Sequence, residues 1–102
     1  MSARIHPTAL VDPSTQFGDD VTVGAFAIIG PRCVIGDGCT IAARGTLEQN
    51  VRLGQRVSIS SGAIIGGDPQ DLKYRGEETW VEIGDDTAVR EYATVTGARR
   101  IP

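Results

Sequence analysis

An apolar residue recurs at every sixth position along most of this 102-residue chain. Neither an α-helix, with 3.6 residues per turn, nor a strand with alternating faces has a period of six. A repeat of six residues is typical of a parallel β-helix, in which short strands and tight turns form the sides of a prism. The series consists of Ile5, Val11, Phe17, Val23, Ile29, Ile35, Ile41, Leu47, Leu53, Ile59 and Ile65, followed after one interruption by Ile83, Val89, Val95 and Ile101.

A second position of the hexad, four residues after each apolar one, carries a small or β-branched residue. Because the two positions have the same parity, both side chains face the same side of a short strand. Glycine often follows the apolar residue, as expected where the chain must turn into the next side. Three hexads then make one triangular coil of 18 residues, and the sequence predicts an all-β fold of about five coils. The second position is occupied by Ala9, Thr15, Val21, Ala27, Cys33, Cys39, Gly45, Val51, Val57 and Ala63.

The period breaks once, and we predict a single domain over residues 1–102 with an external loop at about 66–82. This stretch is rich in glycine and charge, although Trp80-Val81-Glu82 alternates like a strand that leads back into the repeat. Insertions in solenoids project from one face, which is often the binding face. We expect the regular coil to end near 96–98, because Arg99 falls at an inward position and an unpaired buried arginine is costly.

Composition narrows the possible functions. A net charge of −3 and a pI near 5.0 argue against a nucleic-acid surface and against a polybasic membrane patch. The apolar runs are too short for a transmembrane segment, and residues 1–7 lack the apolar core of a signal peptide, so we predict a cytoplasmic protein. Cys33 and Cys39 fit two small buried hydrophobes. Two thiols and the single histidine, His6, make a poor metal site, and we predict neither a metal nor a cofactor.

Several phrases of the sequence resemble one enzyme family. The opening Ile5-His6-Pro7-Thr8-Ala9 and the pentapeptide Gln70-Asp71-Leu72-Lys73-Tyr74, followed by Gly76-Glu77, Val81-Glu82-Ile83-Gly84-Asp85 and Arg90-Glu91, are similar to the acyl-carrier-protein–UDP-N-acetylglucosamine O-acyltransferases of lipid A biosynthesis. These belong to the hexapeptide-repeat acyltransferase superfamily. The similarity runs from about residue 5 to 95 and covers only the N-terminal part of such an enzyme.

This resemblance implies a left-handed β-helix, a homotrimer of parallel prisms and active sites in the clefts between neighbours. It also implies transfer of a 3-hydroxyacyl group from acyl carrier protein to the 3-hydroxyl of the glucosamine ring. Asp71 and Lys73 match loop residues that contact the nucleotide sugar, and Gln70 matches a neighbouring polar contact. The family's catalytic base is a histidine on a later coil, which lies beyond Pro102, so we predict no catalytic residue in this chain.

The chain departs from the family after Arg90-Glu91. Thr96 stands where the family often has histidine or asparagine, and the following Arg-Gly-Thr is replaced by Gly97-Ala98-Arg99. The family's helical C-terminal domain, with its basic surface for acyl carrier protein, is also missing from this sequence.

Three functions therefore stay open. The first is part of the lipid A acyltransferase or of a relative that acylates a 3-amino sugar nucleotide. The second is a non-catalytic trimeric β-helix, as a scaffold or a degenerate short paralogue. The third is a different hexapeptide acyl- or acetyltransferase.

Overall fold

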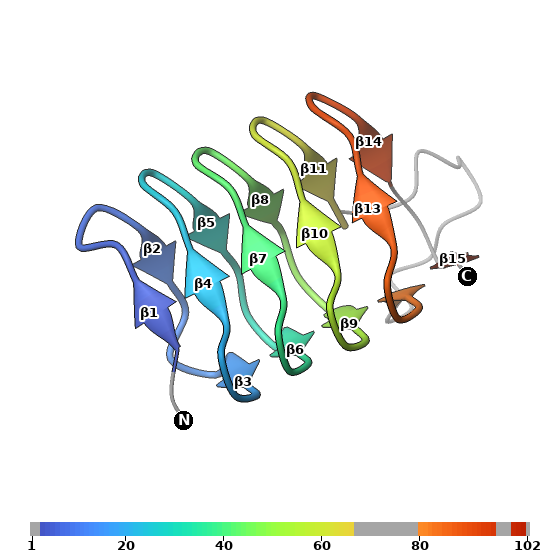
Figure 1. Ribbon diagram of the computed structural model, residues 1–102, viewed down its shortest axis with the longest axis horizontal. Helices are drawn as coiled ribbons and strands as arrows, with labels where there is room; N and C mark the ends of the chain where they lie inside the picture. The colour runs from blue at the N-terminus through green and yellow to red at the C-terminus, as the bar shows by residue number, and fades with distance from the viewer. Residues whose placement is uncertain (1–2, 67–79, 96–98, 102) are drawn as a thin grey trace, which may run out of the picture.

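Within the described residues, fifteen short strands form three parallel sheets that make the sides of a triangular prism (Figure 1). The computed structural model describes residues 3–66 and 80–95 and, for its backbone only, the strand 99–101. Sheet A contains β1 (Arg4–Ile5), β4 (Thr22–Val23), β7 (Thr40–Ile41), β10 (Ser58–Ile59) and β13 (Ala88–Val89). Sheet B contains β2 (Leu10–Val11), β5 (Ile28–Ile29), β8 (Thr46–Leu47), β11 (Ile64–Ile65) and β14 (Thr94–Val95). Sheet C contains β3 (Gln16–Phe17), β6 (Val34–Ile35), β9 (Val51–Leu53), β12 (Val81–Ile83) and β15 (Arg99–Ile101).

Successive coils are joined by backbone hydrogen bonds along the strands and at the turns. The N–H of Arg4 donates to the carbonyl of Val21 over 2.8 Å, and the same step repeats from Thr22 to the carbonyl of Cys39. The register places residues 18 positions apart side by side, as Ile5 beside Val23. The predicted all-β parallel β-helix with five coils is thereby confirmed.

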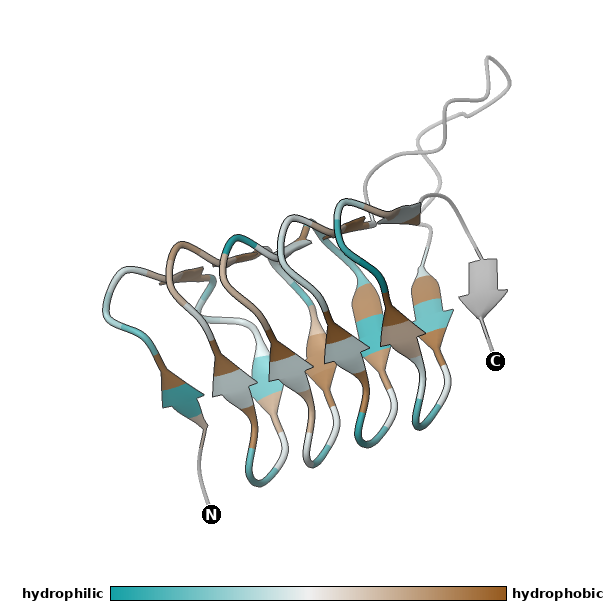
Figure 2. Cartoon of the chain, turned by 45° about the horizontal axis from the view of Figure 1, so that its top comes forward, coloured by the Kyte–Doolittle hydropathy of each residue, from teal (hydrophilic) through white to brown (hydrophobic). Residues whose placement is uncertain are grey.

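The periodic apolar residues line the axis of the prism, as the sequence predicts. Ile41, Leu47 and Ile65 are fully buried, and the small residues of the second position, such as Val21 and Cys39, are buried beside them. Ile5, on the first coil, is 40% exposed because only one neighbouring coil packs against it. Figure 2 shows brown, apolar colour beside grey or teal on many of the strands, as expected where successive side chains alternate between the axis and the outer face.

From the corner at Asp20 onward, the described corners are tight turns with a left-handed residue. At the corner between sheets A and B, the N–H of Gly45 donates to the carbonyl of Ala42, and Arg44 has φ of 63°. Gly24 is needed for close approach rather than for its φ, since a Cβ there would lie 2.7 Å from the backbone nitrogen of Ala43 on the next coil. The described residues contain no helix that could span a membrane.

Two predictions, one about the interruption and one about the C-terminal end of the coil, can be compared with the structure. The strand signal of Trp80-Val81-Glu82 is confirmed, since β12 begins at Val81. The expected end of regular coil near 96–98 is wrong, because β15 pairs in parallel with β12 and places Ile101 beside Ile83. Strand pairing uses backbone groups, so an arginine at position 99 does not prevent it.

Replacing Ile41 with alanine should destabilise the chain by about 2–5 kcal/mol, because the cavity would lie in the middle of the axial stack. The free energy of unfolding, from urea denaturation followed by circular dichroism, measures this. Thr40→Ala is the matched control, since Thr40 is exposed on the outer side of the same strand and should change stability by less than about 0.5 kcal/mol. Equal effects of the two variants would contradict the assignment of inward and outward positions.

Candidate functional site

The predicted substrate residues Gln70, Asp71 and Lys73 lie outside the described residues. The structure does describe both ends of the segment that carries them. The last described residue before it is Gly66, which follows β11 of sheet B, and the first after it is Trp80, directly before β12 of sheet C. The base of the candidate site is therefore the corner between sheets B and C.

Both ends of the segment are held beside Asn50, which lies at this corner one coil earlier. The N–H of Val81 donates to the Asn50 carbonyl over 3.0 Å. Gly66 has φ of +106°, and a Cβ on it would lie 3.0 Å from Cγ2 of Val51 and 3.3 Å from the carbonyl oxygen of Gln49. The departing and returning chains thus flank the same turn, so the segment starts and finishes at a closed neck.

Asn50 is the buried polar residue of this neck, with 3% of its surface exposed. Its backbone is left-handed, with φ of 55°, a conformation that asparagine adopts more readily than most residues. Its side-chain oxygen accepts a hydrogen bond from Nε of Arg32 over 2.8 Å, and its backbone N–H donates to the Pro31 carbonyl. A buried amide needs such partners, because an unsatisfied one would cost about 1–3 kcal/mol.

The returning chain is also fixed on the outer face of sheet C. The guanidinium carbon of Arg52 lies 5.1 Å from the centroid of the Trp80 ring. Nη1 of Arg52 is 3.2 Å from Oε2 of Glu82, its register partner on the adjacent strand. Both charged side chains are about half exposed, so each contact contributes less than about 1 kcal/mol to global stability.

A groove of about 480 Å³ lies next to this cluster and runs along sheet C toward the first coil. Arg52 and Trp80 belong to its lining. Guanidinium, amide and hydroxyl groups in such a groove can hold a polar or anionic ligand. The groove is lined by Ser14, Gln16, Arg32, Cys33, Val34, Arg52 and Trp80.

Cys33 is the only thiol in that lining, and the structure argues against its use as a nucleophile. Its side chain is fully buried, and burial raises the pKa of the thiol above its ordinary value. The thiolate is the reactive form, so a raised pKa leaves Cys33 inert near neutral pH. Cys39 is likewise buried, with its pKa raised by burial. Both fit the predicted role of small hydrophobes.

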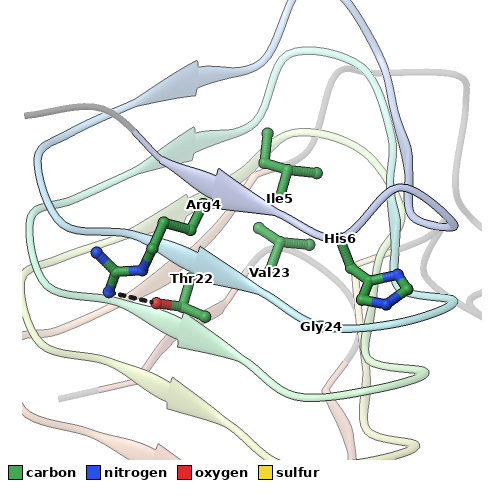
Figure 3. Close-up of a pocket in the computed structure, with 6 residues that line it drawn as sticks. All are labelled: Arg4, Ile5, His6, Thr22, Val23 and Gly24. Atoms are coloured by element: carbon green, nitrogen blue, oxygen red, sulfur yellow. Dashed lines mark hydrogen bonds between the residues drawn. The ribbon is translucent and has the colours of Figure 1, made fainter.

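His6 lies at a different corner of the prism. It follows β1 at the corner between sheets A and B, where its Nδ1 is 2.8 Å from Oγ1 of Thr8. It borders a pocket of about 430 Å³ with Arg4, Ile5, Thr22 and Val23, and Arg4 donates a hydrogen bond to Thr22 there (Figure 3). The structure therefore does not bring His6 to the neck. The described residues also contain no group of three or more histidine, cysteine or acidic side chains that could hold a metal.

Asn50, Arg52 and Arg32 are site residues that the sequence reasoning missed. One signal was present, because the 18-residue coil places Asn50 directly after Arg32 at the same corner. The pairing of Arg52 with Trp80 could not be read in this way, since it depends on where the coil resumes after the insertion.

Comparison with known proteins gives consistent results. A family model described as bacterial transferase hexapeptide (six repeats) matches residues 14–48. The chain is 51% identical to an acyl-[acyl-carrier-protein]–UDP-N-acetylglucosamine O-acyltransferase of Xanthomonas oryzae pv. oryzae. The match spans 96 residues, which are 94% of this chain and 36% of that relative. The chain thus spans about a third of the length of the curated relatives it matches.

Solved structures agree. LpxA, a UDP-N-acetylglucosamine acyltransferase from Bacteroides fragilis, has a TM-score of 0.88 at 39% identity, covering 91% of this chain and 36% of its own. LpxA from Acinetobacter baumannii has a TM-score of 0.87 at 41% identity, covering 90% of this chain and 36% of its own. The likeness includes the strands on both sides of the neck.

Replacing Asn50 should destabilise the chain in a defined order. Asn50→Ala should cost about 1–3 kcal/mol, because it removes the acceptor for Arg32 and places alanine in a left-handed conformation. Asn50→Gly should cost less, because it removes the acceptor but not the tolerance for positive φ. Urea denaturation of the two variants measures the difference. An equal or reversed order would contradict the role of the backbone conformation at this turn.

Proposed function

Because the chain belongs to the hexapeptide-repeat family of acyl-carrier-protein–UDP-N-acetylglucosamine O-acyltransferases, we propose that it forms part of an enzyme that transfers a 3-hydroxyacyl group from acyl carrier protein to UDP-N-acetylglucosamine in lipid A biosynthesis. The observation that carries this proposal is the 51% identity along 94% of the chain, together with the shared fold. A hexapeptide repeat alone would support many transferases. The match extends through the interruption and its pentapeptide, which narrows the substrate class.

In this proposal, Gln70, Asp71 and Lys73 bind the nucleotide sugar. A carboxylate at position 71 accepts hydrogen bonds from sugar hydroxyls. An ammonium at position 73 meets phosphate as a point charge. The closed neck at Asn50 supports these roles, because a segment whose two ends are fixed can present side chains in a reproducible place.

The chemical step needs a general base. A sugar hydroxyl is a weak nucleophile near neutral pH, and a base must take its proton as the oxygen attacks the thioester. Attack releases the carrier thiol, and the acyl group ends as an ester on the sugar. We propose that a histidine from a coil outside this sequence supplies the base. The position of His6, at the corner between sheets A and B, supports this view.

We further propose that the prism assembles as a homotrimer through sheet B. The outward residues of sheet B include Leu10, Ile28 and Ile64, which are 68%, 45% and 40% exposed. These three residues stand in one register along the sheet, with Thr46 between Ile28 and Ile64. Aligned exposed apolar side chains on one face are typical of a protein interface. The outward side of sheet A is polar by contrast, with Thr22, Thr40 and Ser58.

The proposed location is the cytoplasm. Cys33 and Cys39 are both free thiols in the structure, which suits a reducing compartment.

The acyltransferase proposal predicts that the chain binds UDP-N-acetylglucosamine and that Asp71→Ala or Lys73→Ala weakens binding by about tenfold or more, as expected for loss of one charged hydrogen bond. Isothermal titration calorimetry measures the dissociation constant. Glu48→Ala is the control, since Glu48 is exposed at the same corner, one coil away. Binding that is unchanged in both loop variants would contradict the assigned roles.

Catalysis is tested separately by incubating the chain with UDP-N-acetylglucosamine and 3-hydroxyacyl carrier protein and following the acylated sugar by mass spectrometry. We expect binding without turnover. Turnover by this chain would mean that a base lies within these residues. A folded chain that neither binds nor turns over the nucleotide sugar would favour the scaffold function.

The trimer proposal predicts that Ile28→Asp lowers the mass measured by analytical ultracentrifugation from three chains to one, because a charge would be buried at the interface. Thr40→Asp is the matched control on the outer side of sheet A and should leave the mass unchanged. A parent chain that sediments as a monomer, or equal behaviour of the two variants, would exclude sheet B as the interface.

A further inference from the structure

The groove on sheet C gathers positive charge, although the chain as a whole is acidic. It lies beside β6 and β9, which are neighbours along one side of the prism (Figure 1). Arg32 and Arg52 both line it, and none of the described residues in its lining is an aspartate or a glutamate. The net charge of the chain is −3, so this local excess of cations runs against the overall balance. A concave surface with charge of one sign concentrates ions of the opposite sign.

Each of the two guanidinium groups is held by a residue of the next coil. Nε of Arg32 donates to the side-chain oxygen of Asn50 over 2.8 Å, and Asn50 is itself only 3% exposed. Nη1 of Arg52 lies 3.2 Å from Oε2 of Glu82, and its guanidinium carbon lies 5.1 Å from the centroid of the Trp80 ring. Donors that are oriented in advance lose less conformational entropy when an anion binds.

Two carboxylates interact with these arginines from outside the groove. Glu82 accepts from Nη1 of Arg52, which is one of three nitrogens in a planar fork with five N–H donors. Asp12 accepts hydrogen bonds from the backbone N–H and the hydroxyl of Ser14, which lower the pKa of Asp12, and the charge of Arg32 lowers it further. Neither carboxylate belongs to the lining, so the two guanidinium groups are the charged groups of the groove.

The remaining walls of the groove suit a carbon group. Trp80 is the only tryptophan of the chain, and it is half-buried outside the axial core. Val34 is half-buried on the outer side of β6, where it is the register partner of Arg52. The volume of about 480 Å³ is in the range of small-molecule sites and exceeds what an inorganic phosphate fills. An aromatic and an aliphatic wall can therefore pack against a group attached to the anion.

We propose that the groove on sheet C binds a small organic phosphate monoester. The phosphate group is close to a dianion at neutral pH and matches the two guanidinium groups, which bind phosphate oxygens through paired N–H donors. Trp80 and Val34 pack against the carbon part of the ligand. This site includes none of Gln70, Asp71 and Lys73, and it does not depend on the proposed acyltransferase function.

The experiment titrates glycerol phosphate into the full chain at constant ionic strength. Trp80 reports on the groove directly, because tryptophan fluorescence of this chain arises from that residue alone. Val34→Glu places a carboxylate in the groove, and Val34→Gln is its matched control, with a similar shape and no charge. Arg52→Ala removes one guanidinium group. Arg32 is left intact, because it satisfies the buried amide of Asn50.

Arg56→Ala is the control for Arg52→Ala. Arg56 is also an exposed arginine paired with an acid of the next coil, Asp86, and it lies at the other corner of sheet C, between sheets C and A. Circular dichroism checks that every variant is folded. Isothermal titration calorimetry measures the same dissociation constants independently, which separates binding from a direct effect of Arg52 on the fluorescence of Trp80.

The parent chain should show a saturable change in the emission of Trp80. Val34→Glu and Arg52→Ala should raise the dissociation constant about tenfold or more, as expected for a like charge in the site or for the loss of a charged hydrogen bond. Val34→Gln and Arg56→Ala should bind about as tightly as the parent. Inorganic phosphate should bind more weakly than glycerol phosphate, because it has no carbon part to pack against Trp80.

Other outcomes overturn this assignment in distinguishable ways. A folded parent chain without a saturable response would mean that the groove is not a phosphate site. Equal binding by Val34→Glu and Val34→Gln would place the bound phosphate elsewhere on the chain. Binding to vesicles of phosphatidylcholine and phosphatidic acid, without binding of glycerol phosphate, would identify a lipid surface instead.

UDP-N-acetylglucosamine is added last, as a competitor. We expect it to leave the bound glycerol phosphate in place. Displacement would make the groove part of the nucleotide-sugar site and would overturn a separate site. A chain that binds glycerol phosphate in the groove but does not bind UDP-N-acetylglucosamine would contradict the proposed function and support the site on sheet C.

Discussion

The backbone hydrogen bonds between coils are the constraint on which the rest of the molecule depends. The N–H of Arg4 donates to the carbonyl of Val21 on the next coil, the N–H of Asn50 donates to the carbonyl of Pro31 on the preceding coil, and such bonds fix the register between coils. Residues 18 positions apart therefore stack, and every hexad position keeps its direction throughout. The apolar series can then fill the axis without bulky aromatic groups. The same register restricts an insertion, because the chain must return at the position where the interrupted coil stopped.

The insertion satisfies this restriction. Leu53 and Ile83 are register partners although they are 30 residues apart, whereas partners on uninterrupted coils are 18 apart. The chain is back in register at Val81, so the ladder continues undisturbed. The residues that flank the insertion, Gly66 and Val81, both lie beside the turn at Asn50. The coil thereby provides fixed points on both sides of an insertion whose sequence does not have to follow the six-residue period.

The sequence predicted the fold more completely than the site, and particular residues show why. Burial of Ile41 or Val57 is encoded by period alone, so it can be read from one chain. The burial of Asn50 depends on Arg32 and Val81, which contact it from other coils. The contact between Arg52 and Trp80 depends on the register after the insertion, which the pattern does not contain. The end of the coil predicted near residues 96–98 was wrong. That prediction depended on the cost of burying the Arg99 side chain, whereas β15 is held by backbone pairing with β12.

The outer faces of the sheets limit how such prisms associate. Across one coil boundary the N–H of Thr22 donates to the Cys39 carbonyl, while the N–H of Gly38 donates back to the Asp19 carbonyl, so each side of a coil presents both donors and acceptors. Backbone groups therefore do not by themselves select an orientation for end-to-end pairing, and open strand edges are a hazard for aggregation. Lateral association is left to the outer faces, where the chain places Leu10, Ile28 and Ile64 on sheet B and polar residues on sheet A.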